Sequence, residues 1–384
     1  MLTFAAFKRD VARRITRIQS MMAEQGLGAL IIIGSGGPGG FGALRYISNA
    51  HLWGGAAYGV LGAEDPNPWV EVWSSYQAVW TRNETSTRPE RVESPDDIVS
   101  RTATLAKEYA AQSKRIGIVG MQKMSLGEYK AFSRLLEGFE LIDATASFNA
   151  IRQIKTMFEI EALQQNGAIL DASLDVFAEH ARIGARYWDV CAACEAFVKG
   201  KGAFWGRTKL SLDITPFTVP TPKDLCMRED DIINFEIVYE SPWGYWLEMT
   251  TIFSFIELPD DVQALLDGYL MAVENSSAAA KAGNTLRDIS EANDQTLRSL
   301  GYPVVGKHTP DCHSTGLDGS DGPSSVAAPG FVLKPNMVLS FHPGTVLEHN
   351  RGFLISDNFL VTESGSVRLS PHTADRYAIR LNRG

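Results

Sequence analysis

An internal repeat in the second half of the chain most constrains what this sequence can fold into. A helical stretch is followed by a glycine, an aspartate and a further glycine in two places, Gly184, Asp189 and Gly202, then Gly283, Asp288 and Gly301. The intervals match in both copies, five residues and then thirteen. An aspartate before a helix is a natural N-cap, and a glycine after it is a natural stop. The spacing predicts duplicated helix pairs, with Asp189 and Asp288 as the N-caps.

The repeat continues into two pairs of predicted strands. The apolar run 232–236 ends on Glu236, and its counterpart 338–342 ends on His342. Each run is followed by a second predicted strand, at 246–255 and 353–361. A tandem duplication packs its halves about an approximate internal two-fold axis. We therefore expect an α+β domain in which Glu236 and His342 occupy equivalent places near that axis.

The first 150 residues show a different pattern, in which helices alternate with short apolar strands. Apolar residues at spacings of three and four predict helices, and wholly apolar runs predict buried strands. The predicted helices are 8–25, 101–111 and 125–136, and the predicted strands are 29–33, 115–120 and 140–142. This alternation indicates an α/β domain over residues 1–150, followed by the α+β domain over 151–384.

A glycine-rich motif follows the first of these strands. Gly34, Gly36 and Gly39 spell GxGxxG, which in a dinucleotide-binding turn is followed by a helix. Here Pro38 lies inside the turn, the segment 41–55 lacks a helical apolar face, and no ribose-binding acid ends a second strand. The pattern favours a flexible loop bordering a pocket or a partner subunit.

Composition excludes several classes of protein. The chain has 384 residues, is 45% hydrophobic and 21% charged, and carries a formal net charge of −9. An acidic chain without a basic stripe is a poor candidate for binding nucleic acid or an anionic membrane. Four cysteines are too few for a disulfide scaffold, and no secretory leader or membrane-spanning run is evident. We expect a cytoplasmic enzyme acting on a small-molecule substrate.

Several motifs resemble the creatinase/aminopeptidase P superfamily, known as M24 or pita-bread proteins. The matching segments are IRQIK (151–155), HSTGLD (313–318), MVLSFHPG (337–344) and DNFLVTESG (357–365), together with the duplicated helix pairs. The resemblance covers nearly the whole chain. It implies a creatinase-like α/β N-terminal domain, a pita-bread domain with a pseudo-two-fold duplication, and a homodimer in which the N-terminal domain covers the partner's pocket.

The resemblance also implies where a metal site would lie. The metallopeptidases of this family bind two metals through Asp, Asp, His, Glu and Glu. These ligands fall, in that order, on Glu236, Glu248, His313, His342 and Ser356, and a further family histidine falls on Ser320. The histidine of the preceding strand is missing from ITPFTVPTPK (214–223). Ser356 and His342 cannot bridge two ions as carboxylates do, which argues against a dinuclear site.

Two interpretations of this altered pocket remain open. In the first, Glu248, His313 and His342 bind one divalent ion, Zn, Mn or Fe, with Glu236 or Asp357 supporting them. In the second, no metal is bound, as in creatinase, whose LERT segment resembles 247–250. The glutamates then hold the substrate, and His313 or His342 moves the proton. Glu248, His313 and His342 are the expected catalytic residues in both cases.

The expected functions follow from these interpretations. The leading one is a small-molecule hydrolase or lyase of the creatinase type that cleaves a C–N or related bond. The alternatives are an Xaa-Pro-type metallopeptidase and a non-catalytic pita-bread module that binds a peptide or ligand.

Further residues are candidates for binding the substrate. An aromatic wall suited to a flat ring or a cation is formed by Trp205, Trp243 and Trp246, with His51 contributed by the N-terminal domain. Glu240 belongs to the connection between two strands, from which it could reach a ligand. His349 is interpreted as a loop residue. Cys191 and Cys194 form CxxC inside a helix, which favours core cysteines over a zinc or redox site.

Overall fold

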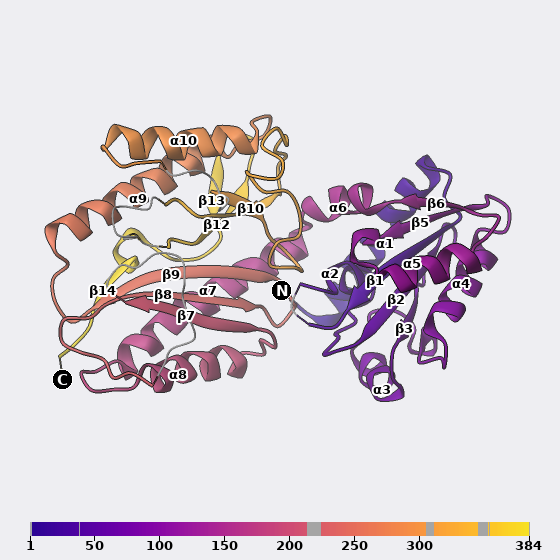
Figure 1. Ribbon diagram of the computed structural model, residues 1–384, viewed down its shortest axis with the longest axis horizontal. Coiled ribbons are helices and arrows are strands. Elements are labelled where there is room, and N and C mark those ends of the chain that lie inside the picture. Colours follow the sequence, from indigo (N-terminus) through magenta and orange to yellow (C-terminus); the bar gives the residue numbers. More distant parts are fainter. Residues whose placement is uncertain are drawn as a thin grey trace. The chain divides into compact units, whose positions relative to one another are not determined.

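The computed structural model describes residues 2–37, 39–212, 224–304, 311–344, 352 and 354–383, and forms two compact units, Met1–Phe158 and Glu159–Gly384 (Figure 1). The expected His349 and the ITPFTVPTPK segment lie outside the described residues. Among the described residues, no helix is both long and apolar enough to cross a membrane.

The first unit is built on a six-stranded sheet in the order β4-β3-β2-β1-β5-β6. Its strands are β1 (Ala29–Ser35), β2 (Ala56–Gly62), β3 (Trp69–Val72), β4 (Val92–Glu93), β5 (Arg115–Val119) and β6 (Glu140–Asp143). Its helices are α1 (Phe4–Glu24), α2 (Gly42–Ser48), α3 (Ser75–Glu84), α4 (Ile98–Tyr109), α5 (Leu126–Leu135) and α6 (Thr145–Gln153). β1, β5 and β6 run parallel, whereas β2 is antiparallel to β1 and β3. The mixed sheet confirms the predicted α/β character.

The glycine-rich motif serves close packing of the backbone. A Cβ on Gly36 would lie 2.1 Å from the Cα of Gly54, and the Gly36 amide donates to the Gly55 carbonyl at 2.7 Å. The segment after the motif contains the short helix α2, which the sequence did not predict. Six of its seven residues are buried, so it has no polar face and therefore no amphipathic pattern.

The second unit contains the duplication. The first copy runs α7 (Met157–His180), α8 (Tyr187–Gly200), β7 (Gly206–Leu212), β8 (Ile232–Glu240) and β9 (Trp246–Ser254). The second runs α9 (Asp260–Ala279), α10 (Leu286–Ser299), β10 (Cys312–Ser314), β11 (Val338–Phe341) and β12 (Asp357–Val361), followed by β13 (Ser366–Arg368) and β14 (Ala378–Arg380). The same order of elements in both copies confirms the predicted repeat.

The strands of the second unit form two four-stranded sheets, β14-β9-β8-β7 and β10-β11-β12-β13. The strands lie between the helices of the two copies, with α7 and α8 on one side and α9 and α10 on the other (Figure 1). This arrangement leaves the facing surfaces of β7–β9 and β10–β12 to form the interior of the domain.

The predicted role of the two aspartates as N-caps was wrong. In α10 the N-cap is Thr285, whose hydroxyl accepts from the Asp288 amide while the Asp288 carboxylate accepts from the Thr285 amide. In α8 the N-cap is Arg186, and Asp189 lies in the first turn. An acidic side chain three residues into a helix can bond back to the N-cap, which accounts for the repeated spacing.

The predicted helix stops are confirmed. Gly202 and Gly301 follow their helices with φ of 97° and 81°, a conformation that favours glycine.

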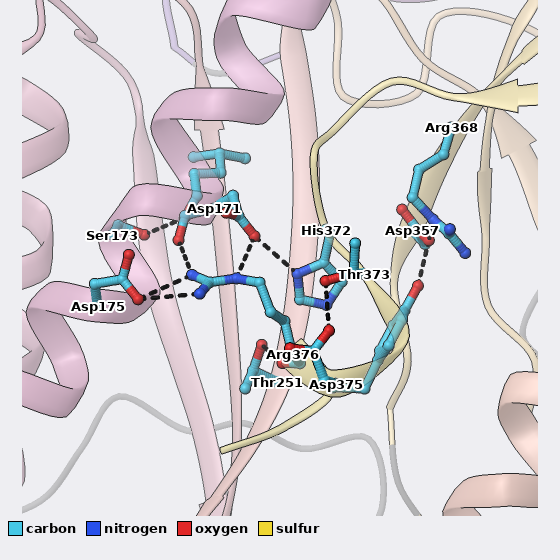
Figure 2. A network of polar contacts seen from close by, with 12 residues as sticks. Asp171, Ser173, Asp175, Thr251, Asp357, Arg368, His372, Thr373, Asp375 and Arg376 are labelled. Atoms are coloured by element: carbon cyan, nitrogen blue, oxygen red, sulfur yellow. Dashed lines mark hydrogen bonds and ion pairs between the residues drawn. The ribbon is translucent and has the colours of Figure 1, made fainter. Parts of the chain in front are cut away.

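A polar network attaches the C-terminal segment to α7 and β12 (Figure 2). The Arg376 guanidinium donates to Asp171 at 2.8 Å and to Asp175 at 3.1 Å, and His372 contacts Asp171 at 3.1 Å. Tyr377, one residue further on, donates a short hydrogen bond to Asp357 on β12. The network therefore fixes the position of β12, whose start borders the candidate site.

Candidate functional site

The site begins with one face of the β7–β8–β9 sheet. Lys209 pairs with Glu236, and Glu236 pairs with Thr250. Directly paired residues in neighbouring strands point to the same face. Thr208, which directly precedes Lys209 in β7, donates from its amide and its hydroxyl to Glu195 of α8, both at 2.9 Å. Lys209 and Glu236 therefore lie on the face turned away from α8.

Glu248 lies on the same face, two residues before Thr250. It is the one partly exposed residue of β9, and its register partner Val238 is the one partly exposed residue of β8. The open part of this face therefore lies at Glu248.

The second sheet supplies the histidines. His313 of β10 pairs with Ser340 of β11, which pairs with Asn358 of β12. His342 follows β11 directly. The Asn358 amide donates to the backbone carbonyl of Glu248 at 2.5 Å, which joins this sheet to β9. The duplication thus brings side chains from two sheets to one point.

Three ligand-type atoms converge there. The Nε2 atoms of His313 and His342 lie 3.0 Å apart, and each lies 3.1 Å from Oε1 of Glu248. Both Nδ1 atoms face backbone carbonyls, that of Ser314 at 3.1 Å and that of Ile355 at 3.3 Å. A ring that donates from Nδ1 presents a lone pair at Nε2. Two such rings and a carboxylate direct three lone pairs at one point.

Glu248 Oε1 receives no hydrogen bond of acceptable geometry from the described residues, although this atom is buried and lies 3.1 Å from both ring nitrogens. A buried carboxylate oxygen of this kind is costly unless a cation or a proton satisfies it. Two imidazoles and one carboxylate, each with its ligand atom free, suit Zn, Mn or Fe. Carbonyls that hold the opposite ring nitrogens are the usual outer partners of metal-binding histidines. The residues therefore fit one divalent ion.

Electrostatics couples the three side chains. Burial alone would raise the pKa of Glu248, but the charges of His342 and His313 outweigh burial and hold that pKa well below its ordinary value. Burial would lower the pKa of His313, but contact with the Glu248 carboxylate raises it. The carboxylate thus favours a proton on His313, and a metal ion bound here would displace such a proton.

Glu236 supports His342 and does not contact the three-atom cluster directly. Its carboxylate is buried and forms a short ion pair with the Lys209 ammonium. The Ser356 hydroxyl donates to Glu236 at 2.8 Å and lies 3.2 Å from Nδ1 of His342. The sequence Lys209, Glu236, Ser356, His342 is thus a continuous polar chain leading to one of the clustered rings.

Asp357 lies apart from this cluster, contrary to the expectation that it supports it. Successive strand residues point to opposite faces, so Ser356 faces the site and Asp357 faces away. The Asp357 carboxylate is buried and accepts from Arg368 at 2.6 Å and from Tyr377 (Figure 2). Asp357 therefore forms a buried ion pair with Arg368.

The tryptophans of the expected aromatic wall and Glu240 lie at the ends of β7, β8 and β9 and in the turn between β8 and β9. Glu240 is the last residue of β8, and not part of a connection as expected; it pairs with Trp246, and both are buried. The Glu240 carboxylate accepts from the Trp205 amide at 3.3 Å. Trp243 is partly buried in the turn between β8 and β9. These residues lie at the end of the sheet next to Glu248.

Two other expectations concern residues that are not members of this three-atom cluster. His51 belongs to the first unit, where it is buried between the rings of Phe41 and Trp80, and burial together with Arg45 lowers its pKa to about 3. It is a neutral core histidine there. Cys191 and Cys194 are buried in α8 as unpaired thiols, in agreement with their interpretation as core residues.

Comparison with known proteins decides the family. A model described as metallopeptidase family M24 matches residues 161–363, more than half of the chain. The chain belongs to the M24 family. A model described as the creatinase/prolidase N-terminal domain matches residues 14–154 of this M24 chain.

Relatives and solved structures of the M24 chain carry peptidase names. A protein of Sinorhizobium fredii described as a hydrolase/peptidase is 28% identical over 64% of the chain and 65% of its own length. The Xaa-Pro dipeptidase of Pyrococcus furiosus is 26% identical over 68% of the chain and 75% of its own length. The crystal structure of the X-Pro aminopeptidase of Thermotoga maritima superposes with a TM-score of 0.81 at 20% identity, covering 95% of this chain and 99% of that one. The fold is the pita-bread fold with a creatinase-type N-terminal domain.

Sequence reasoning missed three residues of this M24 site. Lys209 and Arg207 alternate in β7, where they pair with Glu236 and Val238, and Asn358 holds the backbone of Glu248. The charged residues at alternating positions of RTKLSL were the available signal. The register that pairs β7 with β8 is a tertiary property, so that signal alone assigned them no partner.

Proposed function

We propose that this chain is a hydrolase of C–N bonds in small peptides that uses one divalent metal ion bound by Glu248, His313 and His342. The observation that carries the proposal is the convergence of two imidazole Nε2 atoms and one carboxylate oxygen within 3.0–3.1 Å. Within the described part of the chain, that oxygen lacks a well-formed hydrogen bond. A bound divalent ion polarises a carbonyl and lowers the pKa of water.

The protein's own residues keep the ligands in the required state. The carbonyls of Ser314 and Ile355 hold the protons on Nδ1, so both Nε2 atoms remain available. Lys209 and Glu236 act through Ser356 to orient the ring of His342. An oriented ligand pays less entropy on binding.

The relatives favour a peptidase over the creatinase-type small-molecule hydrolase that the sequence put first. One relative is named an Xaa-Pro dipeptidase and one structural neighbour an X-Pro aminopeptidase. The replacement of two family carboxylates by His342 and Ser356 supports a single ion in place of two. Xaa-Pro dipeptides are therefore the first substrates to test.

A second candidate is a metal-free reaction of the creatinase type. The observation in its favour is the 3.1 Å contact between Nε2 of His313 and the Glu248 carboxylate, in which a proton can take the place of the ion. The rings would then move that proton during cleavage of a C–N bond.

Metal analysis combined with activity separates the two candidates. Purified protein, equilibrated with Zn, Mn or Fe and desalted, is expected to retain one equivalent and to hydrolyse Ala-Pro, with both lost after chelation. Glu248→Gln and His313→Ala are expected to lose the metal and the activity. His180→Ala, an exposed histidine of α7, is the matched control and retains both. Two retained equivalents would contradict the single-ion site, and chelator-resistant cleavage of creatine without metal would favour the second candidate.

A further inference from the structure

The site face contains a row of side chains that is open to solvent. Arg207, Val238 and Glu248 are register partners across β7, β8 and β9, so their side chains share one face. Arg207 is exposed, and the other two are partly exposed. The neighbouring members of β8 and β9 on this face, Glu236, Glu240, Trp246 and Thr250, are all buried. A substrate on this sheet therefore has access along this row.

Arg207 is a free cation within the described part of the chain. Lys209, the other basic residue of β7 on this face, is paired with Glu236. Arg207 forms no ion pair or side-chain hydrogen bond with any residue that the structure describes. The nearest carboxylate in its row is Glu248, which is engaged by His313 and His342. A guanidinium on the same face as this cluster, and not paired with it, can bind an anionic group from outside.

The separation between Arg207 and Glu248 suits a short peptide. Neighbouring strands lie about 4.8 Å apart, so the Cα atoms of Arg207 and Glu248 are separated by about 10 Å. Both side chains extend from the same face, and the arginine side chain is long enough to lean toward Glu248. A dipeptide bound with its scissile bond at Glu248 would have its terminal carboxylate within reach of a long, flexible arginine. Arginine binds carboxylates through two parallel N–H donors.

We propose that Arg207 binds the free carboxylate of the substrate, so that the site selects short peptides and acylated amino acids ending in a carboxylate. This inference rests on the proposed function, because it takes Glu248 as the place where the bond is cleaved. Arg207 then determines specificity and has no role in the chemical step.

Equilibrium binding to the metal-free protein tests this role without requiring hydrolysis. The probes are Ala-Pro and its C-terminal amide, titrated by calorimetry into chelator-treated full-length protein. Wild-type protein is expected to bind the acid at least about 10-fold more tightly than the amide, the effect of one charge-assisted contact. Arg207→Ala is expected to bind the two probes equally, and Arg207→Lys to restore part of the preference. The control is Arg287→Ala, an exposed arginine of α10, which keeps the wild-type ratio.

The outcomes distinguish this proposal from the proposed function. An acid-to-amide ratio that is the same in wild type and Arg207→Ala, or no measurable binding of Ala-Pro to wild type, overturns the role of Arg207. A normal ratio with no hydrolysis by metal-loaded protein overturns the proposed function and leaves Arg207 as a carboxylate site. In hydrolysing protein, Arg207→Ala should raise KM for Ala-Pro 10-fold or more with little change in kcat.

Discussion

Removal of the Lys209 ammonium should destabilise the β7–β8–β9 sheet, because it leaves the Glu236 carboxylate buried without its cation. The Glu236 side chain is 2% exposed and that of Lys209 is 23% exposed. Truncating one partner of a buried ion pair costs about 3–5 kcal/mol. Water can reach Lys209 in part, and the Ser356 hydroxyl still donates to Glu236, so we expect a loss at the lower end, about 3 kcal/mol, for Lys209→Met.

A double-mutant cycle isolates this interaction. Glu236→Gln alone leaves the lysine partly solvated and should cost less than Lys209→Met. The double variant Lys209→Met with Glu236→Gln removes both charges, and its loss should fall short of the sum of the single losses by about 2 kcal/mol. Arg287→Met, at an exposed position of α10, is a control for the long basic side chain and should lie within about 0.5 kcal/mol of wild type.

The assay must report on this sheet alone, because two compact units need not unfold together. Native-state hydrogen exchange, read by mass spectrometry on peptides from β7 and β8, gives the local opening free energy. Losses that add within about 0.5 kcal/mol would refute the reasoning, because they would show that the pair is screened by water and contributes no coupling.

Three further outcomes follow from buried groups. The pKa of Glu71 is raised to about 7 by burial, despite a hydrogen bond from Thr102, so the folded state holds the proton between the unfolded pKa of 4.5 and about 7. Stability should therefore fall as pH rises through that window, by at most about 3 kcal/mol, and denaturation at pH 8 should show Glu71→Gln more stable than wild type. Gly36→Ala should lower the Tm of the first unit by several degrees in calorimetry, because its Cβ would meet the Gly54 backbone at 2.1 Å, and an unchanged Tm would contradict that close packing. Tyr377→Phe removes a donor from buried Asp357 and should cost about 1–3 kcal/mol by chemical denaturation, whereas a neutral result would mean that Arg368 alone satisfies the carboxylate.

Local patterns predicted most of the elements, because periodicity and helix stops are encoded in adjacent residues. The α1 face and the strand β1 follow from apolar spacing alone. The short helix α2 escaped prediction because burial on all sides removes the polar face from which a helix is recognised. Asp189 and Asp288 marked the correct helix starts. In a sequence, an aspartate in the first turn looks like an aspartate at the N-cap, because the two differ only in the position at which the helix begins.

The candidate site shows the same division. Family motifs pointed to Glu248, His313 and His342, and the structure places their ligand atoms within 3.0–3.1 Å. Those motifs gave no means of separating Ser356 from Asp357, because neighbouring strand residues face opposite sides and only the sheet position shows which side is the interior.

The sequence by itself therefore determined the duplicated architecture, its helix stops and the identity of the clustered side chains. Tertiary structure decided their partners, since β7 meets β8, and Ser356 meets Glu236 120 positions away, only through pairing between distant segments. That pairing neutralises Glu236 with Lys209 and leaves Arg207, in the open row, without an ion pair among the residues that the structure describes. Register between strands is fixed by packing of the whole domain, and a one-residue slip would exchange every face.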